Sequence, residues 1–149
     1  MPADVRQGDE RRIVTLTVAA QLRADCPLSA WTGEAGRCGW CNQTIDGRRR
    51  TAWCSDRCRR AFTRNHVWTI ARAGARRRAK YTCTRPGCGA GRDDLEVNHI
   101  DPRNGGGYTD SCAHHADNLE ALCHLHHVEV TNAQRLARAA GSHTEVAPA

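Results

Sequence analysis

The sequence is poor in the residues that build a large hydrophobic core. Aromatic residues make up only 5% of its 149 residues, with a single Phe and a single Met, and hydrophobic residues reach 40%. A chain of this length suits one domain or two very small ones, and small domains bury a poor fraction of their surface. The fold therefore needs a further stabilising element, and disulfides or bound metal are the two options.

A secretory signal and a membrane span are also missing. The start, MPADVRQGDERR, is charged, and the apolar run IVTLTVAA after it is short and has no convincing cleavage site. No stretch approaches the length of a membrane-spanning helix. We therefore expect a reducing, cytoplasmic location and no membrane partner, and there cysteine-rich patterns usually bind metal. The nine cysteines, an odd number, also fit complete disulfide pairing poorly.

Lysine is almost absent, so the positive charge comes from arginine. Lys and Arg total 22, of which Lys80 is the single lysine, and the net charge is +6 with a pI near 9.0. The guanidinium group favours planar, bidentate anions, phosphate above all. We therefore expect a polyanionic partner, of which nucleic acid is the simplest, and a solvated basic surface is the alternative.

Changes in composition divide the chain into segments. They are a poorly defined N-terminal segment (1–36), a cysteine-rich module (37–62), an Arg-rich linking helix (56–80), a second compact segment (81–140) and a flexible tail (141–149). The linking helix is predicted from apolar residues at helical spacing. Cys26 has no closely spaced partner, so we do not assign it as a ligand.

The cysteine-rich module carries two closely spaced cysteine pairs. Cys38 and Cys41 form C-x2-C, and Cys54 and Cys58 form C-x3-C. With Ser55 as the N-cap of a helix, Cys58 falls in the first helical turn, near the sulfur of Cys54. Four thiolates closed in a tetrahedron are typical of a structural zinc site, which has no open position for chemistry.

A second ligand set begins with Cys83 and Cys88, a C-x4-C pair, and continues at Cys123 in LCHLHH. We expect a helix next, with His126 and His127 in its first turn. Adjacent helical side chains point about 100° apart and cannot easily share one metal. His126 is therefore assigned with the three cysteines to a second structural zinc, and His127 is left for another task. The alternative is that His127 is the fourth ligand.

LEVNHI and NLEALC are expected to be strands, which with the following helix form a ββα unit. The loop between them, DPRNGGGYTDSCAHHAD, is long and Gly-rich, and long loops in compact units are usually functional or disordered. His99 at the end of the first strand, Asn118 at the start of the second and His127 on the helix would converge.

Residues 81–136 resemble the HNH endonucleases, of the zinc-stabilised bacterial and phage kind. The resemblance rests on four motifs in order: C-x4-C, LEVNHI, DNLEALC and C-x2-H-H. The resemblance implies an α+β chain in which a treble-clef-like zinc module and a linking helix precede an HNH ββα-metal domain. It also implies a hydrolase of DNA phosphodiester bonds, with double-stranded DNA as the expected partner. His99 would be the general base, His127 would hold a catalytic divalent metal, and Asn118 would orient His99.

The chain departs from the family pattern at Asn98, where many members carry an Asp that binds the catalytic metal. The resemblance makes Asn98 and His127 the ligands of that ion, which is Mg²⁺, Mn²⁺ or another divalent cation. A neutral amide is a poor ligand for Mg²⁺, so we expect Mn²⁺, Co²⁺ or Ni²⁺ to support activity better. The loop offers other ligands: Asp101, His114 and His115. With Cys112, the two loop histidines are also a weaker candidate for a third metal site.

The linking helix supplies the expected contacts to nucleic acid. Its basic residues Arg72, Arg76, Arg77 and Arg78 would bind phosphates, which position a protein on DNA without reading bases. Two other functions remain open. One is a zinc-stabilised DNA-binding module that is catalytically weak or inactive, which Asn98 favours. The other is a protein-interaction adaptor, against which the arginine content argues.

Overall fold

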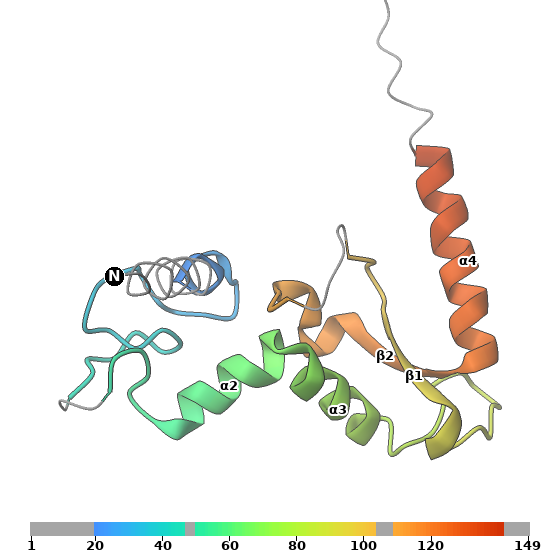
Figure 1. The fold of residues 1–149 in the computed structure, drawn as a ribbon, viewed down its shortest axis with the longest axis horizontal. Helices are drawn as coiled ribbons and strands as arrows, with labels where there is room; N and C mark the ends of the chain where they lie inside the picture. The colour runs from blue at the N-terminus through green and yellow to red at the C-terminus, as the bar shows by residue number, and fades with distance from the viewer. Residues whose placement is uncertain (1–19, 47–49, 104–108, 142–149) are drawn as a thin grey trace, which may run out of the picture. The chain divides into compact units, whose positions relative to one another are not determined.

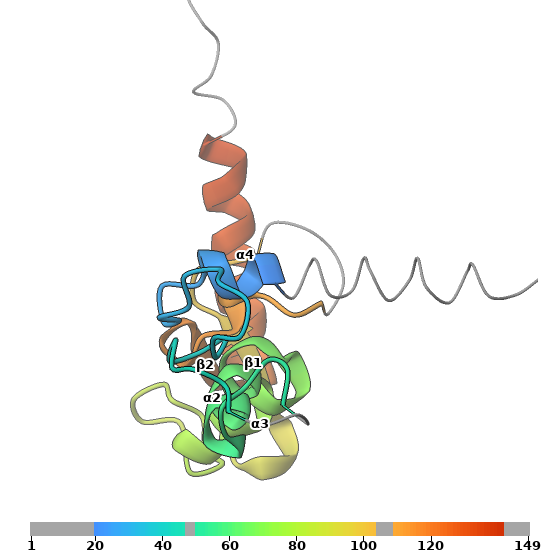
Figure 2. The same ribbon diagram turned by 90° about the vertical axis from the view of Figure 1, so that its left-hand side faces the viewer.

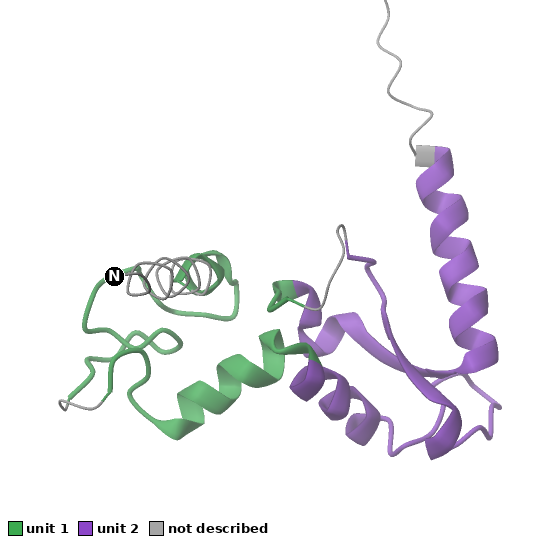
Figure 3. Ribbon diagram, viewed as in Figure 1, with its two compact units in different colours: residues 1–68, 108–112 green, residues 69–107, 113–149 purple. Residues whose placement is uncertain are grey.

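The computed structural model describes residues 20–46, 50–103 and 109–141, which form a mixed α+β chain (Figure 1). The chain divides into two compact units (Figure 3). Unit 1 comprises Met1–Trp68 and Tyr108–Cys112, and unit 2 comprises Thr69–Gly107 and Ala113–Ala149. The expectations for the N-terminal apolar run, the tip of the Gly-rich loop and the end of the tail concern residues outside the described ranges.

Unit 1 contains helix α2, Asp56–His66, which begins where the sequence predicts. The hydroxyl of Ser55 accepts a hydrogen bond from the backbone N–H of Cys58 at 3.3 Å, as an N-cap does. Cys58, Phe62 and His66 are the buried residues of α2. Their spacing of four places them on one helical face, and this face is the interior side of the helix.

The helix predicted over residues 56–80 is in fact two helices. After α2, the chain is extended at Val67 (φ −85°, ψ 114°), and α3 then spans Trp68–Arg78. The carbonyl of His66 accepts a hydrogen bond from the N–H of Ser111 at 3.1 Å. In a continuous helix this carbonyl would instead accept from the fourth residue along. Val67 is β-branched and adopts an extended backbone readily.

Unit 2 contains the two strands that the sequence predicts. β1, Leu95–His99, pairs antiparallel with β2, Leu119–Cys123, so that Leu95 lies opposite Cys123 and His99 opposite Leu119. Side chains alternate between the two faces of a strand. Leu95 and Val97 therefore share one face with His99, and both are buried.

Helix α4, His124–Gly141, follows β2 without a loop and packs on both strands. In Figures 1 and 2 it continues well past the strands. A small core forms among Cys83, Leu95, Leu122 and Cys123, against which Val130 of α4 packs. Within the described ranges neither α4, with its 18 residues, nor a shorter helix combines the length and apolar content needed to cross a membrane.

Candidate functional site

Four cysteines of unit 1 come together as the sequence predicts. The sulfur atoms of Cys38, Cys41, Cys54 and Cys58 all lie within 4.8 Å of one another. Cys41 is 3.5 Å from Cys54 and 3.7 Å from Cys58, and Cys54 is 3.6 Å from Cys58. A tetrahedral zinc ion with Zn–S bonds of about 2.3 Å separates its sulfurs by roughly 3.8 Å. The set suits a closed zinc site of this kind.

The backbone around this group favours the thiolate form of one ligand. Burial opposes ionisation of Cys38, but backbone hydrogen bonds from Cys41, Cys54 and Trp40 outweigh it and lower the pKa of Cys38 to about 6. The turn is closed at Asn42, whose N–H donates to the Cys38 carbonyl and whose φ of 59° is left-handed. Asn is among the few residues that adopt this conformation readily.

A second group lies in unit 2 and uses His126 rather than His127. The ligand atoms of Cys83, Cys88, Cys123 and His126 lie within 4.8 Å of one another. His126 presents Nδ1, which is 3.4 Å from the sulfur of Cys83 and 3.2 Å from that of Cys123. Three thiols and one imidazole are a zinc-type ligand set.

Cys83 is also prepared to be a thiolate. Burial raises its pKa, but backbone hydrogen bonds at Arg85 and Cys123, with smaller contributions from the side chains of His126 and Cys88, bring it down to about 7. The C-x4-C turn depends on Gly87, whose φ of 75° lies in the left-handed region that favours glycine.

His127 points away from the second group and contacts β1. Its Nδ1 lies 3.0 Å from one carboxylate oxygen of Glu96, while Nδ1 of His124 lies 2.7 Å from the other. The hydrogen bond from His124, and the charges of His127 and Arg72, hold the pKa of the Glu96 carboxyl below its usual range. The sequence did not identify Glu96, because its side chain reaches α4 only when β1 and β2 pair in this register.

His99 lies at the end of β1 and contacts a histidine of the loop. Its Nε2 is 3.0 Å from Nδ1 of His114, which is fully buried. Burial lowers the pKa of His99, and the neighbouring charges of His114 and Arg103 lower it further. The imidazole is therefore neutral at pH 7, which is the form that accepts a proton. The carbonyl of His99 accepts from the side chain of Gln134 on α4 at 2.9 Å.

Asn118 closes the loop between the strands. Its Oδ1 accepts from the N–H of Asp101 at 2.7 Å, and its Nδ2 donates to the carbonyls of Asp101 and Ala113 at 3.1 and 2.9 Å. One side chain thus connects the residues that follow His99 to those that precede His114. The Asn118 carbonyl also accepts from the N–H of Ile100 at 2.9 Å.

Asn98 is buried and its amide is already engaged. Nδ2 donates to a carboxylate oxygen of Glu120 on β2 at 3.0 Å. Alternation along β1 places Asn98 and Glu96 on the face opposite to His99. Among the described residues, neither His99 nor His127 belongs to a group of three His, Cys, Asp or Glu ligand atoms within 4.8 Å.

Two of the four predicted phosphate-binding arginines contact the protein itself. Arg76 donates to the carbonyl of Leu95 at 2.5 Å, and Arg78 donates to that of Ala116 at 2.8 Å. Arg72 and Arg77 are exposed. With Tyr81, Arg72 and Arg76 line an open hollow of about 290 Å³ beside α3.

A third group of potential metal ligands contains Cys112 and His115 of the loop, which the sequence offered with His114 as a weaker candidate for a third metal site. His114 is not part of the group, and its other two members are His66 and Cys26, which the sequence did not assign as ligands. Two signals in the sequence pointed to it: the two predicted zinc sites leave Cys26 and Cys112 unassigned, and Cys112 and His115 repeat the C-x2-H spacing of the second site.

Comparison of the chain with protein-family models, curated proteins and solved structures gave no match. The described residues themselves show cysteine and histidine groups of the type that binds zinc. They also place on one face of a two-stranded sheet an imidazole whose pKa is lowered by burial and, on the other face, a carboxylate that contacts a histidine.

Proposed function

We propose that the chain is a metal-dependent endonuclease of the HNH type that hydrolyses DNA phosphodiester bonds. In this proposal unit 2 carries a ββα-metal fold and the four-cysteine group belongs to a treble-clef-like module. The observation that supports it best is that three side chains lie at the end of β1, directly before β2 and at the start of α4. His99 ends β1, Asn118 immediately precedes β2, and His127 lies in the first turn of α4.

His99 acts as the general base. A base must present an unprotonated nitrogen to water, and the lowered pKa of His99 provides one. Nε2 of His99 lies 3.0 Å from Nδ1 of His114. The proposal requires the tautomer in which Nε2 of His99 donates in this contact, which leaves Nδ1 of His99 to accept the proton from water. The hydroxide formed attacks phosphorus, and the 3′ oxygen leaves. Asn118 positions the loop that carries His114 through its hydrogen bonds to Asp101 and Ala113.

His127 and Asn98 are the residues that would hold the catalytic ion. Glu96 accepts from Nδ1 of His127, as carboxylates do behind many metal-binding histidines, and this leaves Nε2 for the metal. A bound divalent cation supplies charge neutralisation at the phosphate and the leaving oxygen. The amide oxygen of Asn98 adds a neutral donor only, so Mn²⁺, Co²⁺ or Ni²⁺ should serve better than Mg²⁺.

DNA is the polyanionic partner that the positive net charge of the chain favours. A net charge of +6, carried almost wholly by arginine, suits phosphate contacts that draw DNA to the protein. Arg72 is exposed and acts electrostatically on Glu96, the residue that contacts His127. A phosphate bound by Arg72 would therefore lie near the proposed metal ligand.

The test is nicking of supercoiled plasmid by the purified full-length chain with Mg²⁺, Mn²⁺, Co²⁺ or Ni²⁺. Wild type should nick the plasmid, and the rate should be lowest with Mg²⁺. His99→Ala should lower the nicking rate by about 10²–10⁴-fold, the usual contribution of a general base. Ile100→Ala is the matched control, because this neighbouring side chain is 55% exposed, and it should nick like wild type.

Three outcomes contradict parts of the proposal. Equal nicking by wild type and His99→Ala would remove His99 from the reaction. Retardation of DNA without cleavage by either protein would support a DNA-binding module that has lost catalysis, which the engaged amide of Asn98 favours. Absence of both binding and cleavage would leave a protein-interaction adaptor.

A further inference from the structure

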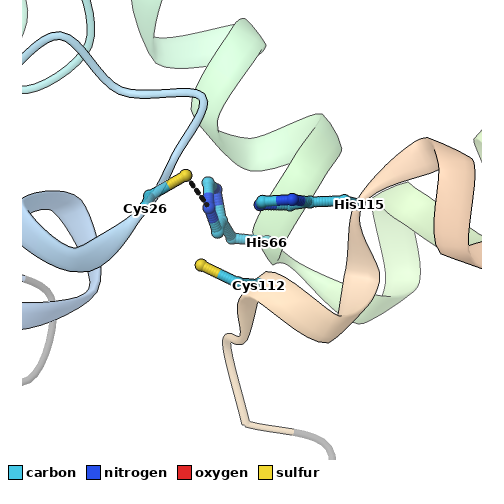
Figure 4. A group of neighbouring side chains, drawn as sticks. All are labelled: Cys26, His66, Cys112 and His115. Atoms are coloured by element: carbon cyan, nitrogen blue, oxygen red, sulfur yellow. Dashed lines mark hydrogen bonds between the residues drawn. The ribbon is translucent and has the colours of Figure 1, made fainter. Parts of the chain in front are cut away.

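The third group gathers two thiols and two imidazoles in the interior of the protein (Figure 4). Cys26, His66 and His115 are 3%, 0% and 8% exposed, and Cys112 is partly buried. One ligand atom from each lies within 4.8 Å of all the others. Cys26, His66 and Cys112 belong to unit 1, and His115 follows Cys112 along the chain at C-x2-H spacing.

The ring of His66 is held in the orientation that a metal ligand needs. Its Nδ1 lies 2.8 Å from the carbonyl of Phe62, one turn earlier in α2. A carbonyl only accepts, so Nδ1 carries the proton and Nε2 carries the lone pair. Nε2 lies 3.2 Å from the sulfur of Cys26. Metal-binding histidines typically donate their other N–H to a backbone carbonyl in this way.

We propose that Cys26, His66, Cys112 and His115 bind a third structural zinc ion. Two thiolates and two neutral imidazoles are a standard tetrahedral zinc set, and four protein ligands leave no open position for chemistry. The proposal also accounts for the composition, because all nine cysteines of the chain then belong to one of three metal groups and none forms a disulfide.

The third ion would fix one part of the loop between the strands. Cys112 and His115 flank His114, whose Nδ1 contacts His99. One coordinate bond on each side of His114 would hold its backbone in place. In the same region the N–H of Ser111 donates a hydrogen bond to the His66 carbonyl. This zinc is therefore expected to be a positioning element. Its existence does not depend on the nuclease proposal.

Metal analysis of the full-length chain tests the site without DNA. Protein produced with zinc and freed of loosely bound metal should contain three zinc ions per chain. Cys112→Ser should contain two, because a serine hydroxyl is a poor zinc ligand. Ala113→Ser is the matched control, since it introduces the same side chain at the next position and removes no ligand. It should retain three.

Cobalt substitution gives a second readout that needs no variant. Titration of metal-free wild type with Co²⁺ should increase the sulfur-to-cobalt absorption up to three equivalents, one of which shows the weaker absorption of a site with two thiolates. A cobalt ion at His127 and Asn98 has no thiolate ligand and adds nothing to this absorption. Saturation of the absorption at two equivalents in the wild type would overturn the proposal, even if Cys112→Ser proved insoluble. Three zinc ions in Cys112→Ser would overturn it as well. A chain that binds three ions but does not nick DNA would contradict only the nuclease proposal.

Discussion

At the scale of single residues, the contacts of the Nδ1 atom distinguish two histidines of α4. His126 and His127 are adjacent, yet Nδ1 of one faces two thiols and Nδ1 of the other faces Glu96. This division was predictable, because it follows from the 100° rotation between neighbouring helical residues. The contacts of His127 with Glu96 and of His99 with His114 were not predictable. The first depends on the register of the strands and the second on the path of the loop.

His114 is expected to control the pH dependence of the proposed base. The pKa of His99 is lowered by burial and then by the charges of His114 and Arg103. Removing the imidazole in His114→Gln should therefore raise the pKa of His99 towards its ordinary value. Nicking needs neutral His99, so the acid limb of the rate profile should move to higher pH. The rate should also fall about 10–100-fold, as for other residues that orient a functional histidine.

The measurement is the nicking rate of wild type, His114→Gln and His114→Ala between pH 5 and 8. This range extends about one to two units to each side of the ordinary His pKa. Glutamine keeps a hydrogen-bond acceptor for Nε2 of His99, so it should retain more activity than alanine. A uniform fall in rate at every pH, with the midpoint unchanged, would assign His114 a purely structural role.

At the scale of elements, local patterns predicted what local forces determine. Alternation indicated β1 and β2, the Ser55 cap indicated the start of α2, and cysteine spacing indicated two metal groups. The break between α2 and α3 at Val67 contains no Pro or Gly that would mark it in the sequence. At this break the carbonyl of His66 accepts a hydrogen bond from Ser111, which is 44 positions beyond Val67 in the chain. The third group was identified only in part for a similar reason: Cys112 and His115 are close in sequence, but Cys26 and His66 lie on two other segments.

The arginines of α3 should separate into two functional classes. Arg72 and Arg77 are exposed, so the double variant Arg72→Gln/Arg77→Gln should weaken DNA binding without changing stability. The slope of log K against log salt should fall by about 1.8, because each lost phosphate contact removes about 0.9. Fluorescence anisotropy of labelled duplex DNA across a salt series measures both effects.

Arg76→Gln is the contrasting variant on the same helix. Arg76 donates to the Leu95 carbonyl at the start of β1, and hydrogen bonds of charged groups contribute about 1.5–3 kcal/mol. This variant should therefore lower the melting temperature of the protein, and the exposed pair should not. Equal loss of DNA affinity and unchanged stability in both variants would place all three arginines at the DNA surface.

At the scale of the whole molecule, the buried apolar residues are few and small. Two of them in α3 are Ala71 and Ala75, and among the described residues five of the thirteen buried hydrophobic residues are cysteines. Thiols in metal groups therefore occupy much of the interior. Since structural zinc supplies folding free energy outright, of about 10–16 kcal/mol per site in zinc-finger peptides, stability should depend on metal more than on apolar packing.

Removal of zinc should therefore unfold unit 1, and tryptophan fluorescence reports this directly because all four tryptophans, Trp31, Trp40, Trp53 and Trp68, lie in unit 1. Chelation at neutral pH should shift the emission to longer wavelength and abolish the cooperative thermal transition, and added zinc should restore both. Cys38→Ser should cause the same spectral change without chelator, because it removes one ligand of the four-cysteine group. Unchanged emission and melting temperature in the metal-free chain would mean that apolar packing alone stabilises unit 1, and the thiol groups would then need another explanation.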